Sequence, residues 1–138
     1  MAAHENASFG ETTLPLPSDA NAPALARSFV ADHLAWLGPD QLDDALILVS
    51  ELVTNAVRYG RPEIILRLRN EPPSVSVEVS DQGPRLPQVA DVPPQPQDES
   101  GRGLLIVDAL ANRWGIDPDR PPPGKTVWFE LGPSSTPS

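Results

Sequence analysis

The chain has 138 residues, which is enough for one domain of ordinary size and too few for a second core. Its formal net charge at pH 7 is −9, so we expect no nucleic-acid partner, because the field of the chain repels a phosphate backbone. The sequence contains no cysteine, which excludes a disulfide framework, a thiolate metal site and a cysteine nucleophile.

The sequence offers no candidate for a secretory leader or a membrane span. The first twenty residues lack a basic start followed by an apolar stretch. The longest apolar run, residues 45–49, is far too short for a helix that crosses a bilayer. We therefore expect a cytoplasmic protein that does not associate with a membrane.

The N-terminal part is expected to form a short strand and then a helix. Residues 12–16 have the length and composition of a strand, and a proline near the first turn opens a helix over residues 23–37. Leu25, Phe29 and Trp36 lie at helical spacing, so we expect them on one face of this helix. A Gly-Pro pair then ends the helix.

The strongest helical pattern covers residues 40–59. Its apolar residues repeat at steps of three or four, at Leu42, Leu46, Val49, Val53 and Val57. A narrow polar wedge holds Asp44, Glu51, Asn55 and Arg58. Glu51 and Asn55 are four residues apart, so their side chains are neighbours that could supply a proton acceptor and an oxygen ligand. An ordinary solvated helix face would also contain these residue types.

The next segment changes to the two-residue period of strands. Ile64, Leu66 and Leu68 alternate with mainly polar residues, and so do Val75, Val77 and Val79, which predicts a β-hairpin. The second strand ends in Asp81-Gln82-Gly83. This sequence places a carboxylate beside a residue that lets a ligand approach the backbone, although it is also a common turn.

The C-terminal third begins with a long segment without periodicity, residues 82–100, which is typical of a functional lid or a disordered segment. Gly101-Arg102-Gly103-Leu104 is then expected to open a short helix that extends through Leu110, Ala111 and Trp114. Free N–H groups at such a helix start could bind an anion, with Arg102 as a counter-charge, but glycine at a helix start is also common.

The last expected element is a strand in which Val127, Phe129 and Leu131 alternate with Thr126, Trp128 and Glu130. Half of the eighteen prolines lie in residues 84–96 and 118–123, which leaves the other segments free to form regular structure. Strands from both ends of the chain with helices between them indicate an α+β two-layer sandwich.

Four motifs in this order resemble the GHKL ATPase superfamily, and more narrowly the actinobacterial ATP-binding proteins related to anti-sigma factor serine/threonine kinases. They are Glu51-Leu-Val-Thr-Asn55-Ala-Val-Arg-Tyr-Gly60, Asp81-Gln-Gly83, Gly101-Arg-Gly-Leu104 and Gly124-Lys-Thr-Val-Trp128. The resemblance covers about residues 12–131, between expected flexible tails at 1–11 and 132–138. It implies a mixed, mostly antiparallel sheet covered on one face by three helices, with ATP between the long helix and a lid at 82–100.

The resemblance also implies roles for individual residues. Asn55 would coordinate Mg²⁺, and Glu51 would act as the general base or orient the attacking hydroxyl group. Asp81 would accept a hydrogen bond from the adenine amino group, Gly83 would admit the base, and Thr126 would support the adenine site. The expected phosphate-binding residues are Gly101, Arg102, Gly103 and Leu104, with the backbone N–H groups of the two glycines as the main donors.

The implied activity is that of a Mg-ATP-dependent serine/threonine protein kinase. It would phosphorylate an anti-sigma-factor antagonist and sequester a sigma factor, and a homodimer is expected from the family. A second hypothesis is a nucleotide-gated module that binds a protein partner without phosphotransfer. A third is a structural domain that binds no nucleotide.

Overall fold

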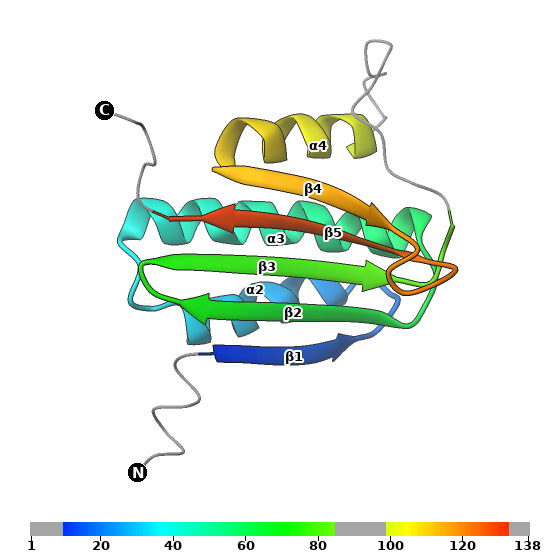
Figure 1. Ribbon diagram of the computed structural model, residues 1–138, viewed down its shortest axis with the longest axis horizontal. Coiled ribbons are helices and arrows are strands. Elements are labelled where there is room, and N and C mark those ends of the chain that lie inside the picture. Colours follow the sequence, from blue (N-terminus) through cyan, green and yellow to red (C-terminus); the bar gives the residue numbers. More distant parts are fainter. Residues whose placement is uncertain (1–9, 85–98, 133–138) are drawn as a thin grey trace.

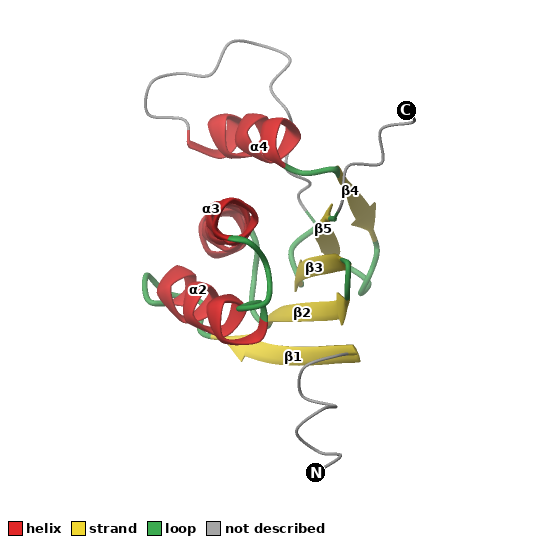
Figure 2. Cartoon of the chain, turned by 90° about the vertical axis from the view of Figure 1, so that its left-hand side faces the viewer, coloured by secondary structure: helices red, strands yellow, loops and turns green. Residues whose placement is uncertain are grey.

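The computed structural model describes residues 10–84 and 99–132, with the backbone alone for 99–104. Five strands form one sheet in the order β1-β2-β3-β5-β4, and three helices lie against one of its faces (Figures 1 and 2). The elements are β1 (Gly10–Leu16), α2 (Ala22–His33), α3 (Pro39–Tyr59), β2 (Ile64–Glu71), β3 (Ser74–Asp81), α4 (Glu99–Leu110), β4 (Arg113–Pro118) and β5 (Lys125–Leu131). The predicted α+β two-layer fold is confirmed.

All pairings between the described strands are antiparallel, so the expected mixed sheet is not observed. The predicted hairpin is confirmed as β2 and β3, which are joined by Pro72 and Pro73. The first strand starts at Gly10, two residues before the predicted start, and pairs along β2. Residues 10 and 11, which we had expected in a flexible tail, therefore belong to the sheet.

The inner face of the sheet, which the helices cover, carries the alternating apolar residues of β2, β3 and β5. Val77 lies opposite Phe129 and Val79 lies opposite Val127, and all four side chains are buried. One step further along the same two strands, Asp81 lies opposite Lys125. The core therefore ends in a pair of charged residues at this end of the sheet.

Helix α3 lies between α2 and α4 in Figure 2 and packs on β3 and β5. Its fully or nearly fully buried side chains are Ala45, Leu48, Val49, Leu52, Val53 and Ala56. The predicted stripe is therefore displaced around the helix, since Leu42, Leu46 and Val57 are half-buried at its border. The displacement arises because the sheet, α2 and α4 each cover a different side of the helix. The buried residues therefore extend further around the helix than a single apolar stripe.

The apolar face that the spacing indicates for the first helix is not its buried face. Leu25 is 47% exposed, Phe29 is half-buried, and Trp36 lies beyond the end of α2 with 40% exposure. The buried side chains of α2 are small and lie on the neighbouring stripe, at Ala22, Ala26 and Val30. Small side chains allow two helices to approach closely, and spacing alone did not indicate which stripe faces α3.

Strand β4 was not predicted, and the expected extension of the last helix through Trp114 is wrong. Trp114 lies in β4, and its Nε1 donates a hydrogen bond to Asp108 of α4 over 2.9 Å. The strand is short and contains glycine, aspartate and proline, so it lacks the β-branched composition that predicts strands. As an edge strand it pairs only with β5.

No described helix is both long enough and apolar enough to cross a membrane.

Candidate functional site

The carboxylate of Asp81 lies at the end of β3, on the helix-covered face, and is only 2% exposed. Its Oδ1 accepts hydrogen bonds from the backbone N of Gly83 at 2.7 Å, from Nζ of Lys125 at 2.9 Å and from the backbone N of Arg61 at 3.3 Å. Within residues 10–84 and 105–132, no hydrogen bond to Oδ2 is found. Hydrogen bonds to Oδ1 therefore hold the carboxylate in place, and Oδ2 can accept a hydrogen bond from a ligand.

Three glycines bring backbone against Asp81 from distant parts of the sequence. A Cβ atom on Gly60 would collide with the carboxyl group of Asp81, and one on Gly124 would collide with its backbone carbonyl. A Cβ on Gly83 would lie 3.1 Å from Oδ1. Because none of these positions has room for a side chain, the close approach requires glycine.

Lys125 is a site residue that the sequence analysis missed. Its side chain is 5% exposed, and Nζ donates to Oδ1 of Asp81 and, over 3.3 Å, to the backbone carbonyl of Gly83. The signal was present in the sequence: extending the alternation of Leu131, Phe129 and Val127 by two more residues places Lys125 on the same face. The predicted strand began one residue too late.

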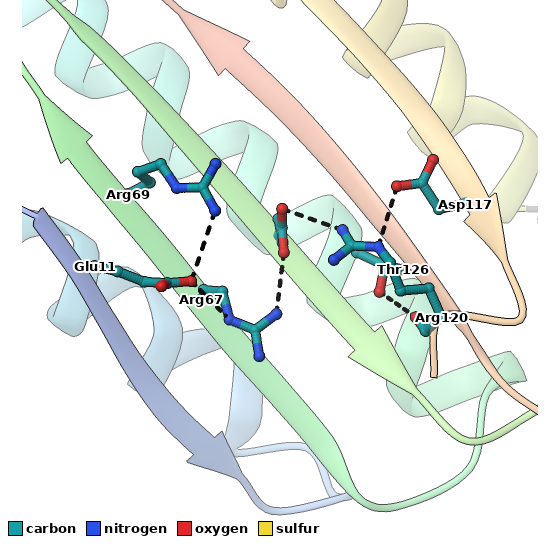
Figure 3. A network of polar contacts seen from close by, with 7 residues as sticks. Glu11, Arg67, Arg69, Asp117, Arg120 and Thr126 are labelled. Carbon is teal, nitrogen blue, oxygen red and sulfur yellow. Dashed lines mark hydrogen bonds and ion pairs between the residues drawn. The ribbon is translucent and has the colours of Figure 1, made fainter. Parts of the chain in front are cut away.

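Thr126 does not lie with Asp81, in contrast to its expected role beside adenine. Successive strand residues point to opposite faces, so Thr126 lies on the open face of the sheet, opposite Ser80 in the register. Its hydroxyl donates a hydrogen bond to the backbone carbonyl of Arg120, as Figure 3 shows. The geometry thus places Lys125, and not Thr126, beside the candidate ligand-binding carboxylate.

Glu51 and Asn55 lie together on α3, and both are half-buried. Ser50 marks the side of α3 that faces α2, because its hydroxyl accepts a hydrogen bond from Arg27 over 2.9 Å. Glu51 and Asn55 are about 100° and 140° further around the helix, so they lie away from the side that faces α2. Their predicted juxtaposition agrees with the fold.

The end of α3 connects these residues with Asp81. Gly60 caps the helix and touches the Asp81 carboxyl group. Along the helix axis, Asn55 lies about 7.5 Å before Gly60 and Glu51 about 13.5 Å before it. The polar side chains of Glu51 and Asn55 and the Asp81 carboxylate therefore follow one another along α3.

Helix α4 begins at Glu99, so the Gly101 to Gly103 motif lies within its first two turns and not at its first residue. Residues 99 and 100, which were expected in the lid, are helical. Of the other residues of the expected lid, the structure describes 82–84, and 85–98 lie outside the described residues. The side chains of Arg102 and Leu104 also lie outside the described part. The helix is anchored by Val107, which is completely buried.

A family model for the histidine kinase-like ATPase domain matches residues 16–131. The chain belongs to the histidine kinase-like ATPase family. The match runs from the last residue of β1 to the last residue of β5, so it includes Glu51, Asn55, Asp81 and Lys125.

Two other comparisons found proteins that are similar to this chain. The solved structure of the RsbU and RsbW domains of Rv1364c from Mycobacterium tuberculosis has the same fold, with a TM-score of 0.65 and 20% identity over 88% of this chain and 31% of that chain. An uncharacterized protein of Streptomyces coelicolor is 49% identical over 41 residues. This segment is 30% of the present chain and 39% of that relative, so the chain spans well under two thirds of either protein's length.

Proposed function

We propose that the chain binds ATP at the Asp81 end of its sheet and acts as a regulatory protein of the anti-sigma factor type. The observation that carries this proposal is the Asp81 carboxylate, which is buried, held through Oδ1 and open at Oδ2. A site of this kind is suited to accept a hydrogen bond from an exocyclic amino group. Adenine offers such a group.

The phosphates would then follow α3 toward Asn55 and Glu51. No cluster of three or more histidine, aspartate or glutamate side chains suited to a metal ion occurs in the described residues. Mg²⁺ bound with nucleotides does not need such a cluster, because it usually takes one or two protein ligands and fills its shell with phosphate oxygens and water. Asn55 can supply one neutral oxygen. A bound Mg²⁺ would neutralise phosphate charge in a protein that is acidic overall.

Within this proposal, Glu51 orients or deprotonates the hydroxyl group of a protein substrate, which gives serine/threonine kinase activity. Support comes from its position one helical turn beyond Asn55, on the same side of α3. The proposed substrate is an anti-sigma-factor antagonist, and the proposed partner in its absence is a sigma factor. Gly101, in the first turn of α4, would bring its backbone N–H group to the phosphates, whereas Gly103 is the fifth residue of the helix and its N–H is used within the helix.

The binding step is tested by isothermal titration of ATP, with and without Mg²⁺, into the wild type and two variants. Asp81→Asn removes the charge on the acceptor while leaving a side chain of similar size, and we expect affinity to fall at least tenfold. Asn55→Ala should abolish most of the Mg²⁺ dependence. Asp117→Asn, on the open face of the sheet, is the matched control and should bind ATP as the wild type does. Absence of ATP binding to the wild type would refute the proposal.

The catalytic step is tested by transfer of radiolabelled phosphate from ATP to candidate antagonist proteins. Glu51→Ala should abolish transfer while sparing ATP affinity, because a base acts on the hydroxyl group and not on nucleotide binding. Tight ATP binding with no transfer to any candidate would instead favour a nucleotide-gated module that binds its partner without phosphotransfer.

A further inference from the structure

We propose that Lys125 determines the base specificity of the site, by donating a hydrogen bond to N1 of adenine while Asp81 accepts one from the amino group. This inference rests on the proposed ATP site and adds a residue with a separate role. Lys125 would thus contact the ligand itself, in addition to neutralising Asp81.

The first argument is a count of hydrogen bonds. A lysine ammonium group has three hydrogens, and the Nζ of Lys125 uses two of them, for Oδ1 of Asp81 and for the carbonyl of Gly83. No acceptor for the third is found among the described residues. Oδ2 of Asp81 is likewise without a donor there. A free donor and a free acceptor thus lie next to each other, on groups only 2.9 Å apart.

The second argument is the polarity of the base edge. Adenine presents an amino donor beside the N1 acceptor, which complements a carboxylate beside an ammonium group. Guanine and hypoxanthine present the reverse, an oxygen acceptor beside an N1–H donor. In this site the base oxygen would face the Asp81 carboxylate, acceptor against acceptor, and the N1–H would face the Lys125 ammonium group, donor against donor. A buried site whose hydrogen-bonding groups complement adenine therefore rejects guanine and hypoxanthine strongly.

The third argument is the choice of cation. Lys125 is the only lysine in the sequence, and the other nine basic residues are arginines. Burial of an ammonium group is costly and requires compensating partners. A lysine ammonium is a compact charge with donors in three directions, whereas the guanidinium group of arginine is a flat fork. The confined space between the carbonyl of Gly83 and Oδ1 of Asp81, both of which Nζ contacts, suits the compact group.

The test is a cycle of two proteins and three nucleotides, measured as dissociation constants. For the wild type we expect 1-deaza-ATP, which lacks the N1 acceptor, to bind about ten- to a hundredfold more weakly than ATP, as for loss of a hydrogen bond to a charged donor. For Lys125→Met we expect ATP and 1-deaza-ATP to bind equally. Inosine triphosphate should bind the wild type at least a hundredfold more weakly than ATP, and this ratio should shrink in Lys125→Met. Arg69→Met, which removes an exposed positive charge on the open face, is the control and should keep both wild-type ratios.

The outcomes separate this inference from the proposed site. Equal affinity of the wild type for ATP and 1-deaza-ATP, or an unchanged ratio in Lys125→Met, would overturn the role of Lys125 and leave the ATP site standing. A further nucleotide, purine riboside triphosphate, has hydrogen in place of the 6-amino group of ATP and probes the contact with Asp81 instead. If it binds as ATP does, the proposed contact of the amino group with Asp81 fails. Absence of ATP binding would overturn both.

A second measurement does not depend on the stability of a variant. Because the sequence has one lysine, protein labelled with isotopic lysine gives a single side-chain signal in NMR spectra. We expect saturating ATP to shift the signal of Lys125 clearly, and 1-deaza-ATP to shift it much less. Equal shifts with the two nucleotides would overturn the proposal.

Discussion

The two faces of the sheet each hold an acid and a base directly opposite one another on neighbouring strands. On the inner face Asp81 lies opposite Lys125, and on the open face Arg67 lies opposite Glu78. The inner side chains are 2% and 5% exposed, whereas Arg67 is 32% and Glu78 is 12% exposed. The same cross-strand arrangement therefore occurs in two very different dielectric surroundings.

The partners of the two pairs differ as well. Figure 3 shows the open-face pair as part of a chain of contacts, in which Glu11 also binds Arg67, and Arg120 bridges Glu78 and Asp117. Among the described residues, the inner pair has hydrogen bonds only to backbone groups besides the one between its own side chains. Loss of one group on the open face leaves the others hydrated and paired, while loss of one inner group leaves a buried charge. The comparison indicates that the open-face pair contributes modestly to stability, whereas loss of one member of the inner pair is costly.

The largest expected effect comes from breaking the inner pair. Lys125→Met should lower the free energy of unfolding by about 3 to 5 kcal/mol, because it leaves the Asp81 carboxylate buried without its counter-charge. Urea denaturation followed by circular dichroism measures this. Lys125→Met combined with Asp81→Asn removes both charges and should recover most of the loss. A single variant within about 1 kcal/mol of the wild type would contradict the difference between the two faces.

The next effect concerns the space around the inner pair. Gly60→Ala should lower the free energy of unfolding by about 2 kcal/mol, because its methyl group collides with the Asp81 carboxyl group. ATP affinity should fall with it. Gly38→Ala is the matched control, since a Cβ there meets no atom within 4 Å, and it should cost less than about 1 kcal/mol. Thermal melts and ATP titrations of the two variants measure their losses of stability and of ATP affinity. Equal losses in the two variants would show that the contact with Asp81 is irrelevant.

A smaller effect is expected from the centre of the open-face network. Glu78→Gln removes the carboxylate that binds both Arg67 and Arg120, and we expect a loss of about 1 kcal/mol at low salt. The loss should shrink in 1 M NaCl, where the screening length is about 3 Å. ATP affinity should not change. A loss that is independent of salt would indicate that this pair behaves like the buried one.

The smallest effect is expected at the rim of the same network. Arg69 lies 3.8 Å from Glu11, and both side chains are about half exposed. Arg69→Met should therefore change the free energy of unfolding by less than about 0.5 kcal/mol. Denaturation midpoints at low and high salt measure it, and a larger loss would show that the network is more cooperative than its exposure indicates.

The sequence predicted most elements of the fold because their patterns are local. The hairpin and the long helix follow from alternation and helical spacing, and both are confirmed. The buried stripe of the first helix could not be predicted, because Ala22 and Ala26 are buried through their contact with another helix. Strand β4 is stabilised by pairing with β5, and its own composition carries no strand signal.

For the site, motif residues were easier to predict than their geometry. Asp81 lies against Gly60 at the end of α3, the helix that carries Glu51 and Asn55. Thr126 and Lys125 are adjacent in sequence but lie on opposite faces, and a motif written in letters does not distinguish them. The start of β5 decides which residue faces inward, and strand boundaries depend on pairing partners that are distant in sequence.

The glycines around Asp81 have a consequence for folding. They come from the end of α3, from the end of the hairpin and from the turn before β5, so the site forms only when these distant segments have met. A partly folded chain would have no complete pocket, and nucleotide would bind the native state alone. At a free concentration one hundred times its dissociation constant, such a ligand stabilises the native state by about 2.7 kcal/mol. The melting temperature should therefore rise with nucleotide concentration, so that cellular nucleotide levels would influence how long the protein survives as well as what it does.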